Sequence, residues 1–106
     1  MYIQGATIKV KLNNLIISNR ILLKLKSKHN VDVNEIEECF LNRTKGLLID
    51  TRLNHKTTPP TYWFISSTNV GRELKIVYIE LPDGRYEIKS AYAPNPTEVR
   101  IYAQYA

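Results

Sequence analysis

The chain has 106 residues, with 15 Lys or Arg against 10 Asp or Glu, so its formal net charge is +5. This length predicts one domain over residues 1–106, and an apolar content of 43% with few glycines and prolines excludes a disordered chain. The basic balance favours an anionic partner, either a nucleic acid or an acidic protein. The single cysteine, Cys39, excludes an internal disulfide, and no early segment is apolar for long enough to be a signal peptide or membrane span. We therefore expect a cytoplasmic protein that does not bind membranes.

The first third of the chain has the pattern of a strand followed by a helix. Residues 7–12 alternate between apolar and polar side chains, which predicts a first strand. From Ile17 to Lys28, apolar residues recur at helical spacing, and the opposite face is basic. That face is either a binding patch or an ordinary solvated helix surface. Asn30 is expected to end the helix, because asparagine tolerates the left-handed conformation that terminates many helices.

A second helix is predicted from Asp32 to about Asn42. Asp32 and Glu35 have the spacing of a capping box, in which each side chain accepts a hydrogen bond from the backbone amide of the other residue. Cys39 lies on or near the apolar face of this helix. We interpret it as a small packing residue, since no second cysteine is available and no histidine stands at a spacing typical of an activated thiol.

The second half of the chain predicts mainly strands. A short strand over residues 46–51 is followed by a polar loop that ends at Pro59 and Pro60, because consecutive prolines cannot donate to a sheet. Turn-forming sequences around Gly71 and Gly84 separate three further strands, over residues 62–68, 73–81 and 85–93.

The last helix has the most complete start signal. Asn95 caps it, Pro96 occupies its first position, and Glu98 completes a capping box. The order of elements, β-α-α-β-β-β-β-α, indicates an α+β domain. We expect an antiparallel four- to five-stranded meander with two N-terminal helices and one C-terminal helix, and Trp63 or Phe64 buried between the layers.

Cations and tyrosines are interleaved along the last strands. The cations are Arg72, Lys75, Arg85 and Lys89, and the tyrosines are Tyr62, Tyr78, Tyr86 and Tyr92. On a sheet surface this combination favours contact with the phosphates of a nucleic acid and stacking of its bases. Tyrosine is also a common strand residue and lysine often covers a solvent face, so an ordinary surface is the alternative.

Few patterns of known catalytic chemistry occur in the sequence. The only histidines, His29 and His55, share no carboxylate cluster at metal-ligand spacing, and neither a glycine-rich phosphate loop nor a GxSxG sequence is present. We therefore expect neither a metal nor a cofactor. Metal-free acid–base cleavage of a phosphodiester needs only a base, an acid and a cation, and the chain has side chains of all three kinds.

Five short blocks of sequence follow one another between residues 26 and 105. They are Lys28–Val31, Glu35–Phe40, Gly71–Val77, Ile88–Ala93 and Glu98–Tyr102. Their order resembles the BrnT family of bacterial toxins, a branch of the RelE-like ribonuclease superfamily. In that family a KHGV segment leads into a helix ending in Phe, and two strands and a C-terminal helix with E-x-R-x-x-Y follow. The chain departs from the family at Tyr92, where arginine is usual, and in the loop 52–58, which is usually acidic.

The resemblance implies a type II toxin: an endoribonuclease that cleaves messenger RNA, free or on the ribosome, and a cognate antitoxin protein that binds it. The candidate catalytic residues are Arg72, Lys89, Arg100 and Tyr102. The candidate RNA-binding residues are Lys75, Arg85, Tyr92, His55 and Lys56. The alternative for each of these cations and for His55 is that the side chain is ordinary solvated surface. The alternative for Glu98 is that it serves only in the capping box.

Two other classes of function compete with the toxin. The first is a non-catalytic module of the same fold that binds RNA or a protein, and Tyr92 in place of the family's arginine favours it. The second is an ADP-ribosyl hydrolase-like enzyme. Enzymes of that kind resemble metal-dependent enzymes that have clusters of aspartates. In this sequence Asp50 and Asp83 are not part of such a cluster. It is the least favoured of the three.

Overall fold

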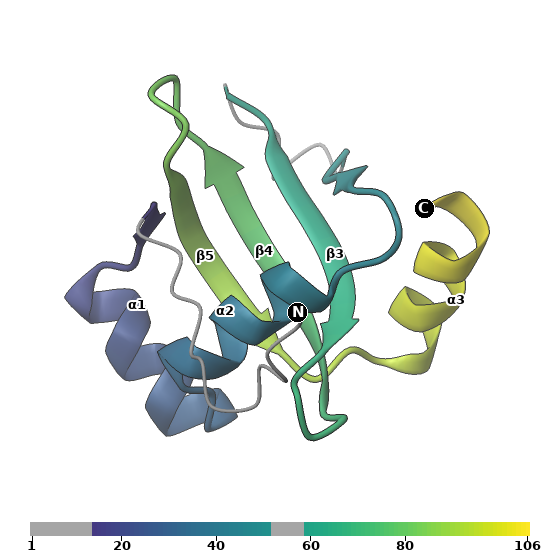
Figure 1. The fold of residues 1–106 in the computed structure, drawn as a ribbon, viewed down its shortest axis with the longest axis horizontal. Helices are drawn as coiled ribbons and strands as arrows, with labels where there is room; N and C mark the ends of the chain where they lie inside the picture. The colour runs from purple at the N-terminus through teal and green to yellow at the C-terminus, as the bar shows by residue number, and fades with distance from the viewer. Residues whose placement is uncertain (1–13, 52–58) are drawn as a thin grey trace, which may run out of the picture.

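The computed structural model describes residues 14–51 and 59–106, which form an α+β fold around one five-stranded sheet (Figure 1). The strand predicted over residues 7–12 lies outside the described residues. The elements in chain order are β1 (Leu15–Ile16), α1 (Asn19–Lys24), η1 (Leu25–His29), α2 (Val33–Asn42), β2 (Leu48–Ile49), β3 (Thr61–Ser67), β4 (Glu73–Glu80), β5 (Tyr86–Tyr92) and α3 (Pro96–Tyr105). None of the described helices is long and apolar enough to cross a membrane.

The sheet has the order β1-β5-β4-β3-β2 and is mixed, so the prediction of an antiparallel sheet holds only in part. The strands β2 to β5 form the expected antiparallel meander. The strand β1 instead runs parallel to β5, with Leu15 opposite Tyr86. The backbone amide of Tyr86 donates to the carbonyl of Asn14 at 2.8 Å. A local pattern does not encode this pairing, because β1 and β5 are separated by most of the chain.

Both predicted hairpin turns are confirmed. Gly71 and Gly84 have φ angles of 89° and 88°, a region that side chains disfavour and glycine tolerates. The ladder between β4 and β5 contains a bulge: Val77 pairs with Ser90 but Tyr78 pairs with Ile88. Lys89 is therefore the extra residue on β5, and such bulges bend a strand and redirect its side chains.

The helix boundaries agree closely with those predicted from the sequence. Capping boxes open α2 at Asp32 and α3 at Asn95. The first helix begins as α1 and continues as η1, a π-helical turn that ends at His29. Asn30 follows with φ 51°, which confirms the expected left-handed terminator. The π-helical turn was not predicted.

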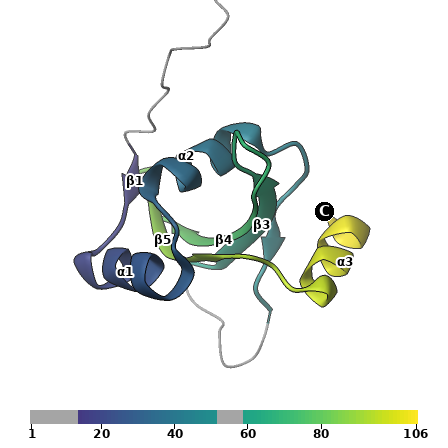
Figure 2. The same cartoon turned by 90° about the horizontal axis from the view of Figure 1, so that it is seen from below.

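The core lies between the concave face of the sheet and α2, while α1 and η1 pack beside β5. Figure 2 shows the sheet curving around α2, with α3 beyond β3. Phe64 is fully buried on the concave side, where the centre of its ring lies 5.0 Å from that of Phe40. Trp63 is buried on the other face against Tyr102 of α3, at 5.8 Å between ring centres. The prediction that Trp63 or Phe64 is buried between the layers is confirmed, and the structure buries both residues, on opposite faces of the sheet.

Cys39 is fully buried in this core, as expected for a packing residue. Burial raises the pKa of its thiol to about 12, with smaller contributions from Glu38 and Glu35. The thiol is therefore protonated at neutral pH, which excludes a thiolate nucleophile.

Candidate functional site

Lys75, Tyr92 and Glu98 meet in one hydrogen-bonded cluster on the face of the sheet that α3 approaches. Lys75 on β4 and Tyr92 on β5 are register partners, so their side chains leave the sheet side by side. Lys75 Nζ donates to Glu98 Oε2 at 2.7 Å, and the Tyr92 hydroxyl donates to the same oxygen at 3.0 Å. Only 10% of the Lys75 side chain and 17% of the Glu98 side chain are exposed. An ion pair this deeply buried carries a large desolvation cost, which makes it a candidate functional site.

The first turn of α3 positions the Glu98 carboxylate. Glu98 Oε1 accepts from the backbone amide of Asn95 at 2.9 Å, and Asn95 Oδ1 accepts from the Glu98 amide at 2.7 Å. The capping box therefore binds one carboxylate oxygen, while the other is presented to the sheet. The same residue starts the helix and pairs with Lys75.

Two aromatic rings flank the ammonium group of Lys75. Its Nζ lies 4.3 Å from the ring centre of Trp63 and 5.6 Å from that of Tyr92. Both distances are within the range of cation–π attraction, which is stronger where water is excluded. The rings and Glu98 together allow a charged lysine to be buried at this position.

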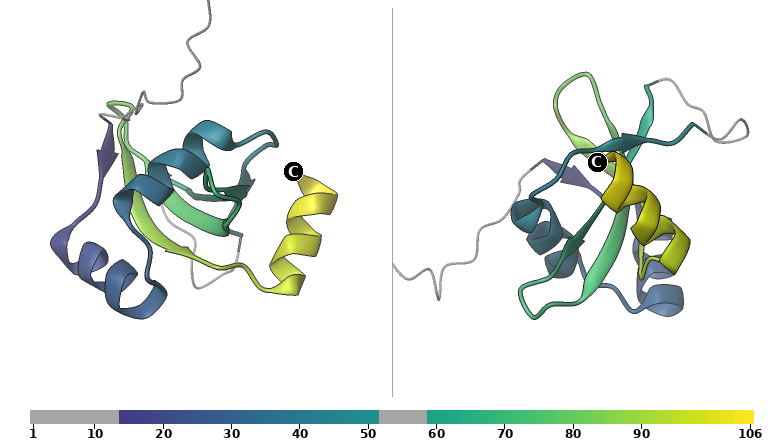
Figure 3. Two further views of the ribbon diagram at one scale, coloured as in Figure 1. Left: turned by 60° about the horizontal axis from the view of Figure 1, so that its bottom comes forward. Right: turned by 90° about the vertical axis from the view of Figure 1, so that its right-hand side faces the viewer.

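A cleft of about 420 Å³ opens above this cluster, between α3 and the β2–β3 edge. Its lining residues are Leu48, Ile49, Asp50, Thr51, Trp63, Lys75, Glu98, Ile101 and Tyr105. Figure 3 shows α3 standing on the side of β3 away from α2. Its volume is within the range of small-ligand sites, which is roughly 300–1,000 Å³.

The polar partners of Glu98 keep it ionised. Burial of the carboxyl opposes ionisation, but hydrogen bonds from Lys75, the Asn95 amide and Tyr92 outweigh it and hold the pKa of Glu98 below its ordinary value. At neutral pH the cluster therefore contains a carboxylate, which can accept a proton, beside a cation and a phenol.

His29 lies beside the cluster, on η1. Its ring centre is 5.6 Å from that of Tyr92, with 38° between the ring planes. Burial, and then the charges of Lys24 and Lys28, lower the pKa of His29. The imidazole is therefore neutral at neutral pH. The π-helical turn brings His29 here, and π-turns occur frequently at functional sites.

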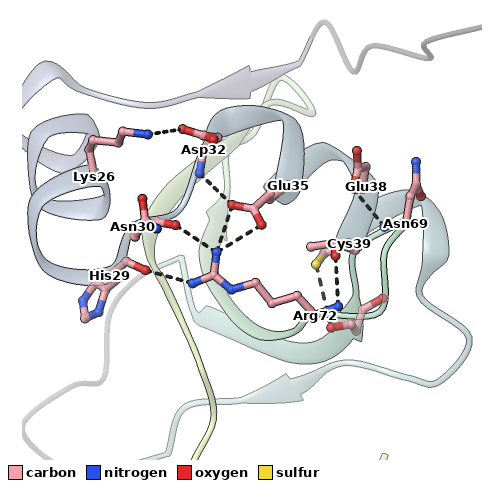
Figure 4. A network of polar contacts seen from close by, with 11 residues as sticks. Lys26, His29, Asn30, Asp32, Glu35, Glu38, Cys39, Asn69 and Arg72 are labelled. Atoms are coloured by element: carbon pink, nitrogen blue, oxygen red, sulfur yellow. Dashed lines mark hydrogen bonds and ion pairs between the residues drawn. The ribbon is translucent and has the colours of Figure 1, made fainter.

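Arg72, a candidate catalytic residue, lies immediately before β4 and contacts Glu35 in the first turn of α2 (Figure 4). Its guanidinium contacts both carboxylate oxygens of Glu35 at 3.0 Å and donates to the carbonyls of Asn30 and His29 at 2.8 and 2.9 Å. Nη1 makes the contacts to Glu35 and Asn30 and Nη2 the contact to His29, so both terminal nitrogens of the guanidinium hold the η1–α2 connection against the sheet. These contacts give Arg72 a structural role.

Tyr102, another candidate catalytic residue, is buried and connects α3 to the segment before β2. Its hydroxyl donates to the carbonyl of Gly46 at 2.7 Å. Burial raises the pKa of this phenol, while Arg43 and a hydrogen bond from the Ile65 backbone oppose the rise. The contacts are those of a side chain that positions the helix.

The remaining candidates are distributed over the surface. Lys89 is exposed at the β5 bulge, where its Nζ is 3.8 Å from Glu87 Oε2. Arg100 is exposed on α3. Arg85 pairs with Asp83 in the β4–β5 turn at 2.7 Å. Lys75 and Tyr92 belong to the buried cluster, and His55 and Lys56 lie outside the described residues.

Sequence reasoning did not identify Trp63 and His29 as neighbours of the site, and it interpreted Glu98 as a capping residue. The capping box predicts a partner for only one carboxylate oxygen of Glu98. The other oxygen was the feature of the sequence that could have indicated a second role. Within residues 14–51 and 59–106, no three His, Cys, Asp or Glu side chains are grouped as metal ligands.

The described residues define the class of the protein as a small α+β domain with a partly buried Lys–Glu–Tyr cluster under a cleft. No family model, no curated protein and no solved structure matches the chain.

Proposed function

We propose that this chain is a metal-independent endoribonuclease that cleaves messenger RNA and inhibits translation, as the toxin of a type II toxin–antitoxin pair. The observation that supports it best is the cluster in which one oxygen of Glu98 meets the ammonium of Lys75 and the hydroxyl of Tyr92. Metal-free cleavage of a phosphodiester requires a base, an acid and a cation, and these side chains can supply all three.

In this proposal Glu98 takes the proton of a ribose 2′-hydroxyl. The 2′-oxygen then forms a bond to phosphorus while the bond to the 5′-oxygen breaks, leaving a 2′,3′-cyclic phosphate and a 5′-hydroxyl. Lys75 offsets the charge that develops on the phosphate and supplies a proton to the departing 5′-oxygen. A phosphate that draws Lys75 away from Glu98 also raises the basicity of the carboxylate, because an opposite charge near it is reduced.

The test is cleavage of an end-labelled RNA by purified protein in the presence of a chelator. Glu98→Gln is the informative variant, because glutamine can keep the capping hydrogen bonds but cannot act as the base. We expect it to lower cleavage at least about a hundredfold, the usual scale of a general base. The matched control, Glu87→Gln on β5, should cleave normally. The products should carry 2′,3′-cyclic phosphate ends.

A second function, a non-catalytic module that binds RNA or a protein such as an antitoxin, is favoured by one specific observation. Arg72 and Tyr102 are both engaged in contacts that hold elements together. Normal host growth on expression, and intact RNA after incubation with folded protein, would contradict the first function and favour the second.

A further inference from the structure

The cleft beside α3 combines apolar walls with a charged floor. Ile49, Ile101 and Tyr105 line it while remaining 50%, 39% and 67% exposed. Lys75 and Glu98 lie at its floor with Trp63. Apolar side chains left partly exposed around a concave polar site are typical of a pocket that binds a small organic molecule.

The floor and walls match the two chemically different ends of a nucleotide. The ammonium of Lys75 suits a phosphate group, and it lies 4.3 Å from the centre of the Trp63 ring. The ring of Tyr105 and the side chain of Ile101 offer a surface on which a flat base can pack, since base stacking tolerates every base. A purely apolar ligand would leave the buried Lys75–Glu98 pair without any additional polar partner.

We propose that this cleft binds a single nucleotide unit of RNA, with the base on Ile101 and Tyr105 and the phosphate toward Lys75. The proposal rests on the proposed function and names the part of the substrate that this site recognises. Because Glu98 already pairs with Lys75, the phosphate competes with a carboxylate, and the base must contribute much of the affinity. Nucleotides should therefore bind more tightly than inorganic phosphate.

The test uses the fluorescence of Trp63, the only tryptophan in the chain, which lines this cleft. The probes are nucleoside 3′-monophosphates, the corresponding nucleosides, and inorganic phosphate. We expect a saturable change with the nucleotides and at least about tenfold weaker binding of inorganic phosphate, because one stacked base contributes on this scale. The absence of a saturable change up to millimolar nucleotide would overturn the proposal, and so would equal binding of inorganic phosphate.

Two variants and a control locate the binding. Tyr105→Ala and Ile101→Ala remove cleft walls and should weaken nucleotide binding several-fold. Val99→Ala is the matched control, because Val99 is on the same helix, is 36% exposed, and lines a different pocket with Asn42 and Lys45. An equal loss in Val99→Ala would mean that the nucleotide binds elsewhere. Circular dichroism of each variant checks that α3 is intact.

Nucleotide binding and RNA cleavage can fail separately in this design. Glu98→Gln removes the carboxylate that competes with the phosphate for Lys75, so this variant should bind nucleotides at least as tightly as the wild type while it cleaves RNA poorly. If the wild-type protein binds nucleotides but leaves RNA intact, the ribonuclease proposal fails and the cleft proposal stands. If RNA is cleaved while Trp63 is insensitive to every nucleotide, the cleft proposal fails and the ribonuclease proposal stands.

Discussion

Lys75 and Glu98 form an ion pair with 2.7 Å between Nζ and Oε2, and it joins the centre of the sheet to the first turn of α3. The two residues are 23 positions apart in the chain. Each is also bound by a third group, Trp63 for the ammonium and the Asn95 amide for the carboxylate. The position of α3 and the ionisation of the candidate site therefore depend on the same ion pair.

Removing one member of this pair should cost more stability than removing both. Lys75→Met leaves the Glu98 carboxylate buried without its cation, and we expect a loss of about 3 kcal/mol in the free energy of unfolding. The double variant Lys75→Met, Glu98→Gln should recover part of that loss, since no uncompensated charge remains. Urea denaturation of the wild type, both single variants and the double variant measures the coupling. Additive losses would mean that the pair contributes no coupling.

Glu98 should also make stability depend on pH in the acidic range. Its pKa is lower in the folded protein than the ordinary value of 4.5, so its contribution is fully present above that pH. The contribution is lost as the pH falls through the lower pKa of the folded state. We expect the wild type to lose more stability between about pH 6 and pH 3 than Glu98→Gln, measured by urea denaturation at each pH. Identical pH profiles would contradict this assignment.

Replacing Arg72 should reduce stability, in contrast to a freely exposed arginine. Arg72→Ala removes charge-assisted hydrogen bonds to Glu35 and to two backbone carbonyls, and we expect a loss of about 2 kcal/mol. Arg72→Lys should restore little, because an ammonium cannot reproduce the planar fork. The matched control is Arg85→Ala in the exposed β4–β5 turn, which should change stability by under about 0.5 kcal/mol. Equal effects at the two positions would refute the structural role.

Tyr102→Phe should lower stability without changing RNA affinity. The variant keeps the ring on Trp63 but leaves the Gly46 carbonyl without its hydroxyl donor, at a cost of about 1 to 2 kcal/mol. Thermal denaturation measures the loss, and a filter-binding titration measures affinity. Tyr105→Phe is the control for the stability measurement alone, because Tyr105 is exposed. A fall in RNA cleavage with unchanged stability would instead assign Tyr102 to the chemistry.

Outside the cleft, Lys89 and Arg100 are the exposed candidates for contact with RNA phosphates. If each neutralises one phosphate, replacement by alanine should weaken binding across RNA sequences. The slope of log affinity against log salt should also fall by roughly one for each phosphate that is no longer neutralised. Lys26→Ala is the control, because Lys26 pairs with Asp32 beside α2. Unchanged slopes in both test variants would identify Lys89 and Arg100 as ordinary solvated surface.

The candidate site could be predicted only in part from the sequence. Lys75 and Tyr92 were among the predicted RNA-binding residues, but the sequence did not indicate that they meet Glu98. Register places Lys75 opposite Tyr92 across β4 and β5, and the course of the chain after β5 then brings the first turn of α3 over them. The position of Arg72 beside a turn is typical of an exposed arginine. Its partner Glu35 is 37 positions earlier in the chain, so the local sequence does not indicate the ion pair.

The sequence by itself determined the features whose physical cause lies within a few residues. Capping boxes place the starts of α2 and α3, Asn30 ends η1, and Gly71 and Gly84 allow the turns that order β3, β4 and β5 as a meander. Only the tertiary structure decided that β1 runs parallel to β5 and that Lys75 is buried beside Trp63. These features depend on contacts between distant segments, whose free energies are set by which surfaces the whole fold removes from water.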